Sequence, residues 1–181
     1  MPSSTWTDAY LGVGANVGDR AAQIDRALVR LDAQAGVSVQ RTSSAYESEA
    51  HRRPDQDNVP VFLNGVVHIR TTRAPAALLD VTQALEQQAG RAADRARWAP
   101  RPLDLDLLVV GSAVVSTERL TLPHPRLHER RFVLAPWAEL APNLWIPHPF
   151  DATVQKLLQS CTDTHALRRH AAPLARSLPS A

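Results

Sequence analysis

The chain has one cysteine, little net charge and no long apolar run, and each of these shortages excludes a class of protein. Cys161 is the one cysteine among 181 residues, so neither a disulfide framework nor a cysteine-based zinc site is available. The formal net charge is only +2, which excludes a polybasic nucleic-acid tail. No stretch approaches the ~18 consecutive apolar residues that a membrane span needs, and the N-terminus lacks the pattern of a secretory signal. We therefore expect a cytoplasmic protein that binds neither nucleic acid nor membrane.

The length and hydrophobic content place limits on the domain organisation. A chain of 181 residues with 44% hydrophobic residues is typical of one globular domain with an ordinary core. Residues 1–7 have no regular pattern and are expected to form a loose start. Residues 162–181 are Ala, Arg, Ser and Pro with little periodicity, so we expect a weakly ordered tail. This leaves residues 8–161 as a single domain.

The periodicity of apolar residues predicts an α+β domain. Strands are expected over 9–13, 37–46 and 61–69, with a further strand ending at Val110, and helices over 20–35, 76–89, 132–140 and 152–158. The first six main elements follow the order β-α-β-β-α-β. Two split βαβ units of this kind predict a ferredoxin-like antiparallel sheet with helices packed on it and long loops between the elements.

The segment RWAPRPLDLDLL, residues 97–108, carries the clearest functional signal. Leucines alternate with Asp104 and Asp106, which predicts a strand with one apolar face and one face bearing two carboxylates. Residues at i and i+2 of a strand lie roughly 6.5–7 Å apart, so two bare carboxylates repel each other unless a cation lies between them. The segment indicates a magnesium site for a polyphosphate, or alternatively a solvated strand face beside a basic surface.

Arginine clusters around this strand. All but one of the 20 basic residues are arginine, and eight of them fall between Arg91 and Arg131. The planar guanidinium matches phosphate oxygens with two parallel hydrogen bonds, so the clustering favours the polyphosphate interpretation.

Four other motifs carry weaker signals. The glycine-rich segment 12–19 (GVGANVGD) lacks the spacing of a dinucleotide fingerprint and is interpreted as a tight turn with a helix cap. Phe62 and Asn64 share one strand face, where they would either stack and hydrogen-bond a flat heterocycle or belong to an ordinary core. Gln83 and Glu86 share a helix face. His124 and His128 lack a third ligand, so a zinc site is not favoured.

Taken together, the motifs resemble those of the 6-hydroxymethyl-7,8-dihydropterin pyrophosphokinase family. The resemblance covers residues 9–158, and RWAPRPLDLDLL is its most specific part. The other matching segments follow in the family's order and are GANVGD, FLNGVV, QALE with Gly90–Arg91, and LPHPRLHERRFVLAP. The resemblance implies that the hydroxymethyl oxygen of the pterin attacks the β-phosphorus of ATP, so that the pyrophosphoryl group moves and AMP leaves.

The resemblance also assigns roles to individual residues. It implies a monomer that takes two small-molecule substrates, with ATP as co-substrate and two magnesium ions (Mg²⁺). The catalytic positions are Arg91, Arg101, Asp104 and Asp106, of which Asp104 and Asp106 hold the magnesium. The nucleotide positions are Gln83, Glu86, Arg97, Trp98, Leu107 (through its backbone), Arg119, Thr121, His124 and Arg130. The pterin positions are Ser48, Glu49, Phe62, Asn64, Trp98 and Phe132.

The chain departs from the family pattern in residues 48–53 and at Ala93 and Asp94, which leaves alternatives open. One is a paralogue that keeps ATP and magnesium but uses another hydroxymethyl heterocycle. The other is a ferredoxin-like RNA-binding module, against which the low net charge and the paired aspartates argue.

Overall fold

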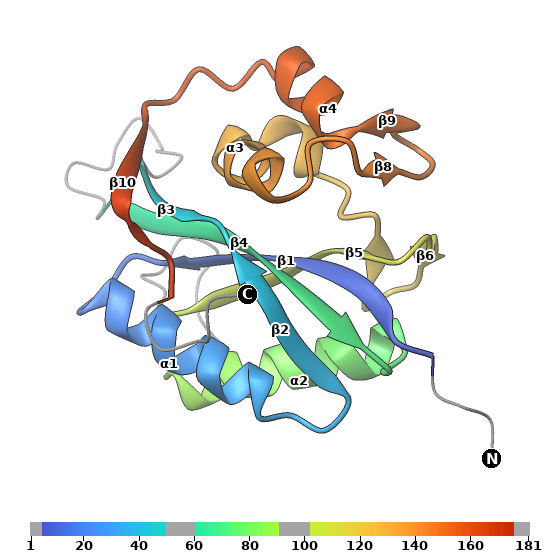
Figure 1. Ribbon diagram of the computed structural model, residues 1–181, viewed down its shortest axis with the longest axis horizontal. Coiled ribbons are helices and arrows are strands. Elements are labelled where there is room, and N and C mark those ends of the chain that lie inside the picture. The colour runs from blue at the N-terminus through green and yellow to red at the C-terminus, as the bar shows by residue number, and fades with distance from the viewer. Residues whose placement is uncertain (1–4, 50–60, 91–101, 176–181) are drawn as a thin grey trace.

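The computed structural model describes residues 5–49, 61–90 and 102–175, and it confirms the α+β, ferredoxin-like fold (Figure 1). The elements in chain order are β1 (Thr7–Ala15), α1 (Arg20–Asp32), β2 (Val37–Thr42), β3 (Ser44–Ser48), β4 (Phe62–Thr71), α2 (Pro75–Gln88), β5 (Asp104–Val110), β6 (Val115–Ser116), β7 (Thr121–Leu122), a 3₁₀ turn (Leu127–Glu129), α3 (Arg131–Leu140), β8 (Trp145–Ile146), β9 (Ala152–Thr153), α4 (Val154–Ser160) and β10 (Leu167–Pro173).

The central sheet has six strands, and all of its pairings are antiparallel. Its order is β10-β3-β4-β1-β5, and β2 also pairs with β4. Strand β1 therefore lies between β4 and β5, which is the arrangement that two split βαβ units produce. Helices α1 and α2 cover one face of the sheet and α3 covers the other (Figure 1).

Local signals explain where the first two helices begin and end. The carboxylate of Asp19 accepts a hydrogen bond from the backbone N–H of Ala22 at 3.1 Å, which caps α1. Gly36, with φ at +75°, allows the turn into β2 after the helix. Pro75 opens α2, where its missing N–H costs no helical hydrogen bond.

Each face of the sheet has its own hydrophobic core. On the α1 and α2 face, Leu28 and Leu31 pack against alternate residues of the central strands, including Leu11 and Val67. On the α3 face, Trp137 is fully buried in a second cluster, which includes Tyr10, Val66 and Leu108. The alternation of strand side chains thus supplies both layers from the same three strands. Within the ranges given above, no helix is both long and apolar enough to cross a bilayer.

Several element boundaries differ from the sequence prediction: the first helix ends at Asp32 and not at residue 35, and the helix expected over 152–158 is strand β9 followed by α4. Two further differences lie in the central sheet. β1 runs to Ala15, so Gly12 and Gly14 lie within the strand and not in the following turn. The stretch 37–46 divides into β2 and β3 because Ser43 forms a bulge against Val66. The Ser43 N–H donates to the Val66 carbonyl at 2.9 Å, and the Ser43 hydroxyl accepts from the Val66 N–H at 3.0 Å. Apolar periodicity does not register a bulge, since one extra residue leaves the composition unchanged.

The C-terminal segment also differs from the prediction. Residues 167–173, expected to belong to a weakly ordered tail, form β10 and extend the sheet beyond β3. Leu174 is 2% exposed and fills the space above Gly65, where an added Cβ would lie only 2.4 Å from the Leu174 Cδ2. Pairing with the edge of β3 and burial of Leu174 order this segment, and both depend on distant residues.

Replacing Leu174 by alanine tests this packing. We expect the Leu174→Ala variant to lose about 2–5 kcal/mol of unfolding free energy in urea, because a buried leucine leaves a cavity. The Val114→Ala variant is the control, since Val114 is 56% exposed and should change stability by less than about 0.5 kcal/mol. Equal stabilities for the two variants would contradict the placement of the C-terminal segment.

Candidate active site

Strand pairing brings Asn64 and Asp104 to the same face of the sheet, on either side of Gly14. Gly14 of β1 is the register partner of Asn64 on β4 and of Asp104 on β5. Directly opposed residues of antiparallel strands point to the same face and lie about 5 Å apart at their Cα atoms. Two residues further along each strand, Gly12 of β1 is the register partner of Asp106 of β5. Both aspartates therefore lie on the α3 face, and the predicted carboxylate-bearing strand face is present.

The two glycines leave the sheet between these polar groups without side chains. A Cβ added at Gly14 would lie 2.9 Å from the Asn64 Oδ1, so any other residue there would press on this amide. A Cβ at Gly12 would meet the Leu108 Cδ2 at 3.6 Å. The glycine-rich segment 12–19 was interpreted as a turn, although the strand expected over 9–13 includes Gly12, and the role of these two glycines beside the polar groups was not predicted. Their spacing of two residues directly after an apolar strand segment was the available signal.

The predicted pterin residues Ser48, Phe62 and Asn64 come together on β3 and β4. Ser48 is the register partner of Phe62, and its hydroxyl accepts a hydrogen bond from the Asn64 Nδ2 at 2.7 Å. Both polar residues are buried, whereas Phe62 is half-buried. The bond fixes the amide of Asn64, whose other end faces Gly14. Glu49 lies just beyond β3 and is exposed.

Helix α3 brings Arg130 and Phe132 to the same site. The Arg130 Nη1 donates to the Asp106 Oδ2 at 2.9 Å, and the two side chains are 19% and 36% exposed. The Arg130 guanidinium also lies over the ring of Phe132, 6.0 Å from its centroid. A cation and a half-buried aromatic ring are thus adjacent to a carboxylate that lies 24 residues from Arg130 in the sequence.

Glu86 takes a position that its sequence assignment did not anticipate. It is 5% exposed, and its Oε1 accepts a hydrogen bond from the backbone N–H of Leu105 at 2.8 Å. β5 is the last strand of the sheet on this side, so this N–H lies at the edge of the sheet. Leu105 stands between the two aspartates. Glu86 therefore anchors the strand segment that carries them.

His124 lies beside the carboxylate and the guanidinium and is held by two backbone bonds. Its N–H donates to the Leu108 carbonyl at 2.9 Å, and its Nδ1 accepts from the N–H of Arg126 at 3.1 Å. Burial lowers the pKa of His124; the charge of Asp106 opposes this effect, and the charge of Arg130 adds to it. The lowered pKa favours the neutral ring, and because Nδ1 accepts a hydrogen bond, the neutral ring carries its proton on Nε2.

Three other predicted nucleotide residues, Gln83, Arg119 and Thr121, are exposed. Arg119 forms an ion pair with Asp80 at 2.7 Å, and its Nη2 lies 3.5 Å from the Gln83 Oε1. The Leu107 side chain is in the core, which leaves only its backbone for contact with a ligand. Gln83 thus differs in environment from Glu86, although the two were predicted to share a helix face.

Four predicted site residues lie outside the described part of the chain. These are Arg91, Arg97, Trp98 and Arg101. Within the described ranges, no group of three or more His, Cys, Asp or Glu side chains is arranged to hold a metal ion. The two aspartates are a smaller set, and Mg²⁺ in phosphate-transfer sites commonly uses one or two carboxylates together with substrate phosphates and water. The donors therefore fit a magnesium site that the substrate completes.

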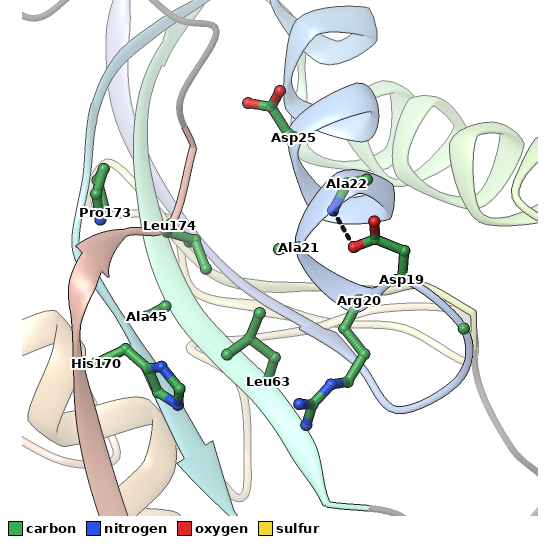
Figure 2. Close-up of a pocket in the computed structure, with 11 residues that line it drawn as sticks. Asp19, Arg20, Ala21, Ala22, Asp25, Ala45, Leu63, His170, Pro173 and Leu174 are labelled. Carbon is green, nitrogen blue, oxygen red and sulfur yellow. Dashed lines mark hydrogen bonds between the residues drawn. The ribbon is translucent and has the colours of Figure 1, made fainter.

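A cavity of about 450 Å³ lies on the opposite face of the sheet, between α1 and β10 (Figure 2). Arg20 and His170 approach it from opposite sides of Leu63, and both contact Glu47, at 2.8 Å and 3.1 Å. Hydrogen bonds from His170 and then from Arg20 hold the pKa of Glu47 below its usual value. Among the described residues, none of the predicted site residues lines this cavity, which lies on the other face of the sheet from Asp104.

Comparison with known proteins identifies a matching family. A family model described as "7,8-dihydro-6-hydroxymethylpterin-pyrophosphokinase (HPPK)" matches residues 10–142. The "2-amino-4-hydroxy-6-hydroxymethyldihydropteridine pyrophosphokinase" of Methylorubrum extorquens is 45% identical over 140 residues, which cover 77% of this chain and 86% of that protein. The protein of the same name from Bacillus subtilis is 42% identical over 132 residues, covering 73% and 77% of the two chains.

Solved structures show the same fold at low sequence identity. The Plasmodium falciparum HPPK-DHPS wild type with SDX-DHP has a TM-score of 0.65 at 14% identity, covering 86% of this chain and 44% of that chain. An HPPK-DHPS in complex with substrates has a TM-score of 0.65 at 13% identity, covering 85% and 43%. The chain thus spans less than half the length of these solved proteins.

The protonation of His124 provides a test of the site geometry. In metal-free buffer, an NMR titration should give His124 a pKa below 6.5, since burial disfavours the imidazolium. The Asp106→Asn variant should lower this pKa further, because it removes the negative charge that favours protonation. Because the folded pKa is depressed, the unfolded chain binds the extra proton first, and stability should fall as the pH drops below about 6.5. A pKa that rises in the variant would contradict the proximity of the two groups.

Proposed function

The chain belongs to the 7,8-dihydro-6-hydroxymethylpterin-pyrophosphokinase family, and on that premise we propose that it transfers pyrophosphate from ATP to the hydroxymethyl group of 6-hydroxymethyl-7,8-dihydropterin in folate biosynthesis. The bond from the hydroxymethyl oxygen to the β-phosphorus forms, the bond from the β-phosphorus to the AMP oxygen breaks, and the hydroxyl proton is released. The observation that carries the proposal is the strand register: Asn64 and Asp104 lie on either side of Gly14, on the same face of the sheet.

Asp104 and Asp106 are the residues that would hold magnesium, and we propose two ions, as in the family resemblance. Magnesium, when bound, supplies positive charge that offsets the triphosphate and assists loss of the hydroxyl proton. Glu86 is proposed as a nucleotide residue that also supports β5, because its carboxylate accepts a hydrogen bond from the N–H of Leu105 between the two aspartates.

The nucleotide is proposed to bind along β5 and the arginines around it. Transfer of a phosphoryl-type group depends mainly on positioning and charge neutralisation, and guanidinium groups supply both. Arg130 already lies at Asp106 and places its charge where the phosphates would meet the metal. The further nucleotide contacts are proposed for Arg91, Arg97, Trp98, Arg101, Gln83, Leu107 through its backbone, Arg119, Thr121 and His124.

The pterin is proposed to bind between Phe62 and Phe132, with Asn64 at the edge of its ring. The two aromatic residues come from opposite sides of the site, one from β4 and one from α3, and both are half-buried. Asn64 has one amide end held by Ser48, so the other end is oriented for a heterocycle lying over the glycines. Trp98 and Glu49 are proposed to complete this pocket. Because Gly14 has no side chain, nothing on β1 presses on the Asn64 Oδ1, which an added Cβ would approach to 2.9 Å.

Replacing either aspartate tests the catalytic assignment. With ATP, magnesium and the pterin, we expect the wild-type protein to release AMP, and the Asp104→Asn and Asp106→Asn variants to lose about 10²–10³-fold in kcat, the usual effect of removing one electrostatic group. Asp151→Asn is the control, since Asp151 is an exposed residue near the β8–β9 hairpin. ATP binding by the wild-type protein without release of AMP would overturn the proposed reaction.

Replacing Asn64 tests the pterin site separately from the nucleotide site. The Asn64→Ala variant should bind the pterin about 10- to 100-fold more weakly, because a lost hydrogen-bonding group at a buried heterocycle edge has an effect of this size. Its affinity for magnesium and ATP, measured by calorimetry, should change less than about twofold. An equal loss of affinity for both substrates would indicate a collapsed fold and contradict this division of the site.

A further inference from the structure

The C-terminal strap, defined here as residues 161–173, connects two elements that carry the proposed pterin site. Figure 1 shows the chain leaving α4, passing over α3 and returning to the sheet as β10. The strap lies beyond residues 10–142, the part of the chain that the family model matches. Its contacts are therefore features of this chain that the family match does not describe.

At one end of the strap, Asp163 binds the start of α3. Its Oδ2 accepts a hydrogen bond from the N–H of Arg131 at 3.1 Å, and its side chain is 4% exposed. Its Oδ1 accepts from the N–H of His165 at 3.0 Å and lies 2.6 Å from the His165 Nδ1. The N-cap residue of α3, Arg130, makes no side-chain cap hydrogen bond. Asp163 therefore supplies from a distance the acceptor that the helix start needs.

Four residues later, the strap reaches the other wall of the site. Leu167, the first residue of β10, is the register partner of Ser48 on β3. Ser48 is the residue whose hydroxyl holds the amide of Asn64. The segment 163–167 thus spans from the helix start that carries Phe132 to the strand end that orients Asn64.

The far end of α3 is held independently of Asp163. Glu139 accepts hydrogen bonds from the Ser44 N–H at 2.8 Å and the Tyr46 hydroxyl at 2.7 Å, and forms an ion pair with Arg169 at 2.8 Å. These contacts fix the last turn of the helix to β3 and β10. Loss of the Asp163 contact would therefore release the first turn while leaving the helix docked.

We propose that Asp163 is a positioning residue that sets the distance between Phe132 and the opposite wall formed by Phe62 and Asn64. The proposal rests on the proposed function, since it concerns the width of the pterin pocket. Part of the selectivity for the pterin would then depend on the C-terminal strap, which lies outside residues 10–142, the range that the family model matches. Arg130 retains its own ion pair with Asp106, so the nucleotide end of the site depends less on Asp163.

Steady-state kinetics of three variants test this role. Asp163→Ala should raise the KM for the pterin about tenfold, because a tenfold change corresponds to the free energy typically lost with a helix cap. The KM for ATP and kcat should each change less than about twofold. Asp163→Asn keeps an oxygen acceptor for the Arg131 N–H and should restore most of the affinity. Asp32→Ala is the matched control: it removes a carboxylate-to-amide bond of 2.7 Å to Val39, between α1 and β2, and should leave both KM values unchanged.

Amide hydrogen exchange supplies a readout that does not depend on turnover. In Asp163→Ala, exchange should accelerate at residues 131–134 while the last turn of α3 keeps its protection, and Asp32→Ala should not affect α3. Unchanged exchange at 131–134, or an unchanged pterin KM in Asp163→Ala, would overturn the positioning role. A wild-type protein that releases no AMP would instead overturn the proposed function, and the exchange pattern would still decide whether Asp163 holds the helix.

Discussion

The pairing of β1 with both β4 and β5 is the constraint on which the rest of the structure depends. In this register Gly14 lies between Asn64 and Asp104, and Gly12 opposes Asp106. A shift of one residue in either pairing would turn every side chain of the moved strand to the other face, and the amide and the carboxylates would no longer share a surface. Because the residue between Asn64 and Asp104 is a glycine, no side chain of β1 separates the amide from the carboxylate.

The two aspartates lie on a strand at the edge of the sheet and are held from two sides. Glu86 reaches from α2 and occupies the N–H of Leu105, and Arg130 reaches from the start of α3 to Asp106. Neighbouring carboxylates repel, so the guanidinium offsets charge that the sheet alone would leave unbalanced. The supporting contacts also explain why a buried glutamate is compatible with the fold, since a buried carboxylate needs hydrogen-bond partners.

The two faces of the sheet carry different features. The α1 and α2 face holds the larger core and the cavity beside Arg20, whereas the α3 face holds the proposed site. Strand residues alternate between these faces, so Leu63 contributes to the cavity while its neighbours Phe62 and Asn64 contribute to the site. The C-terminal segment contacts both faces, one through Leu174, which follows the strap, and the other through Arg169 of the strap.

Short-range patterns were sufficient to predict the main helices, the α+β class and the strand that carries Asp104 and Asp106. These follow from periodicities of 3.6 and 2 residues, which neighbouring residues express directly. They did not reveal the bulge at Ser43 or strand β10, because a bulge and an added edge strand depend on hydrogen bonds to a partner strand that is distant in sequence. The environment of Glu86 was missed for the same reason, since its partner is a backbone amide 19 residues away.

By itself, the sequence determined which chemical groups are present and in what order: paired carboxylates on an alternating strand, clustered arginines, and aromatic and amide residues on another strand. Only the tertiary structure decided that Arg130 meets Asp106, that Gly14 lies between Asn64 and Asp104, and that Asp163 completes the start of α3. The physical reason is that periodicity is a local property of the chain, whereas strand register and contacts between distant elements arise from packing the whole molecule.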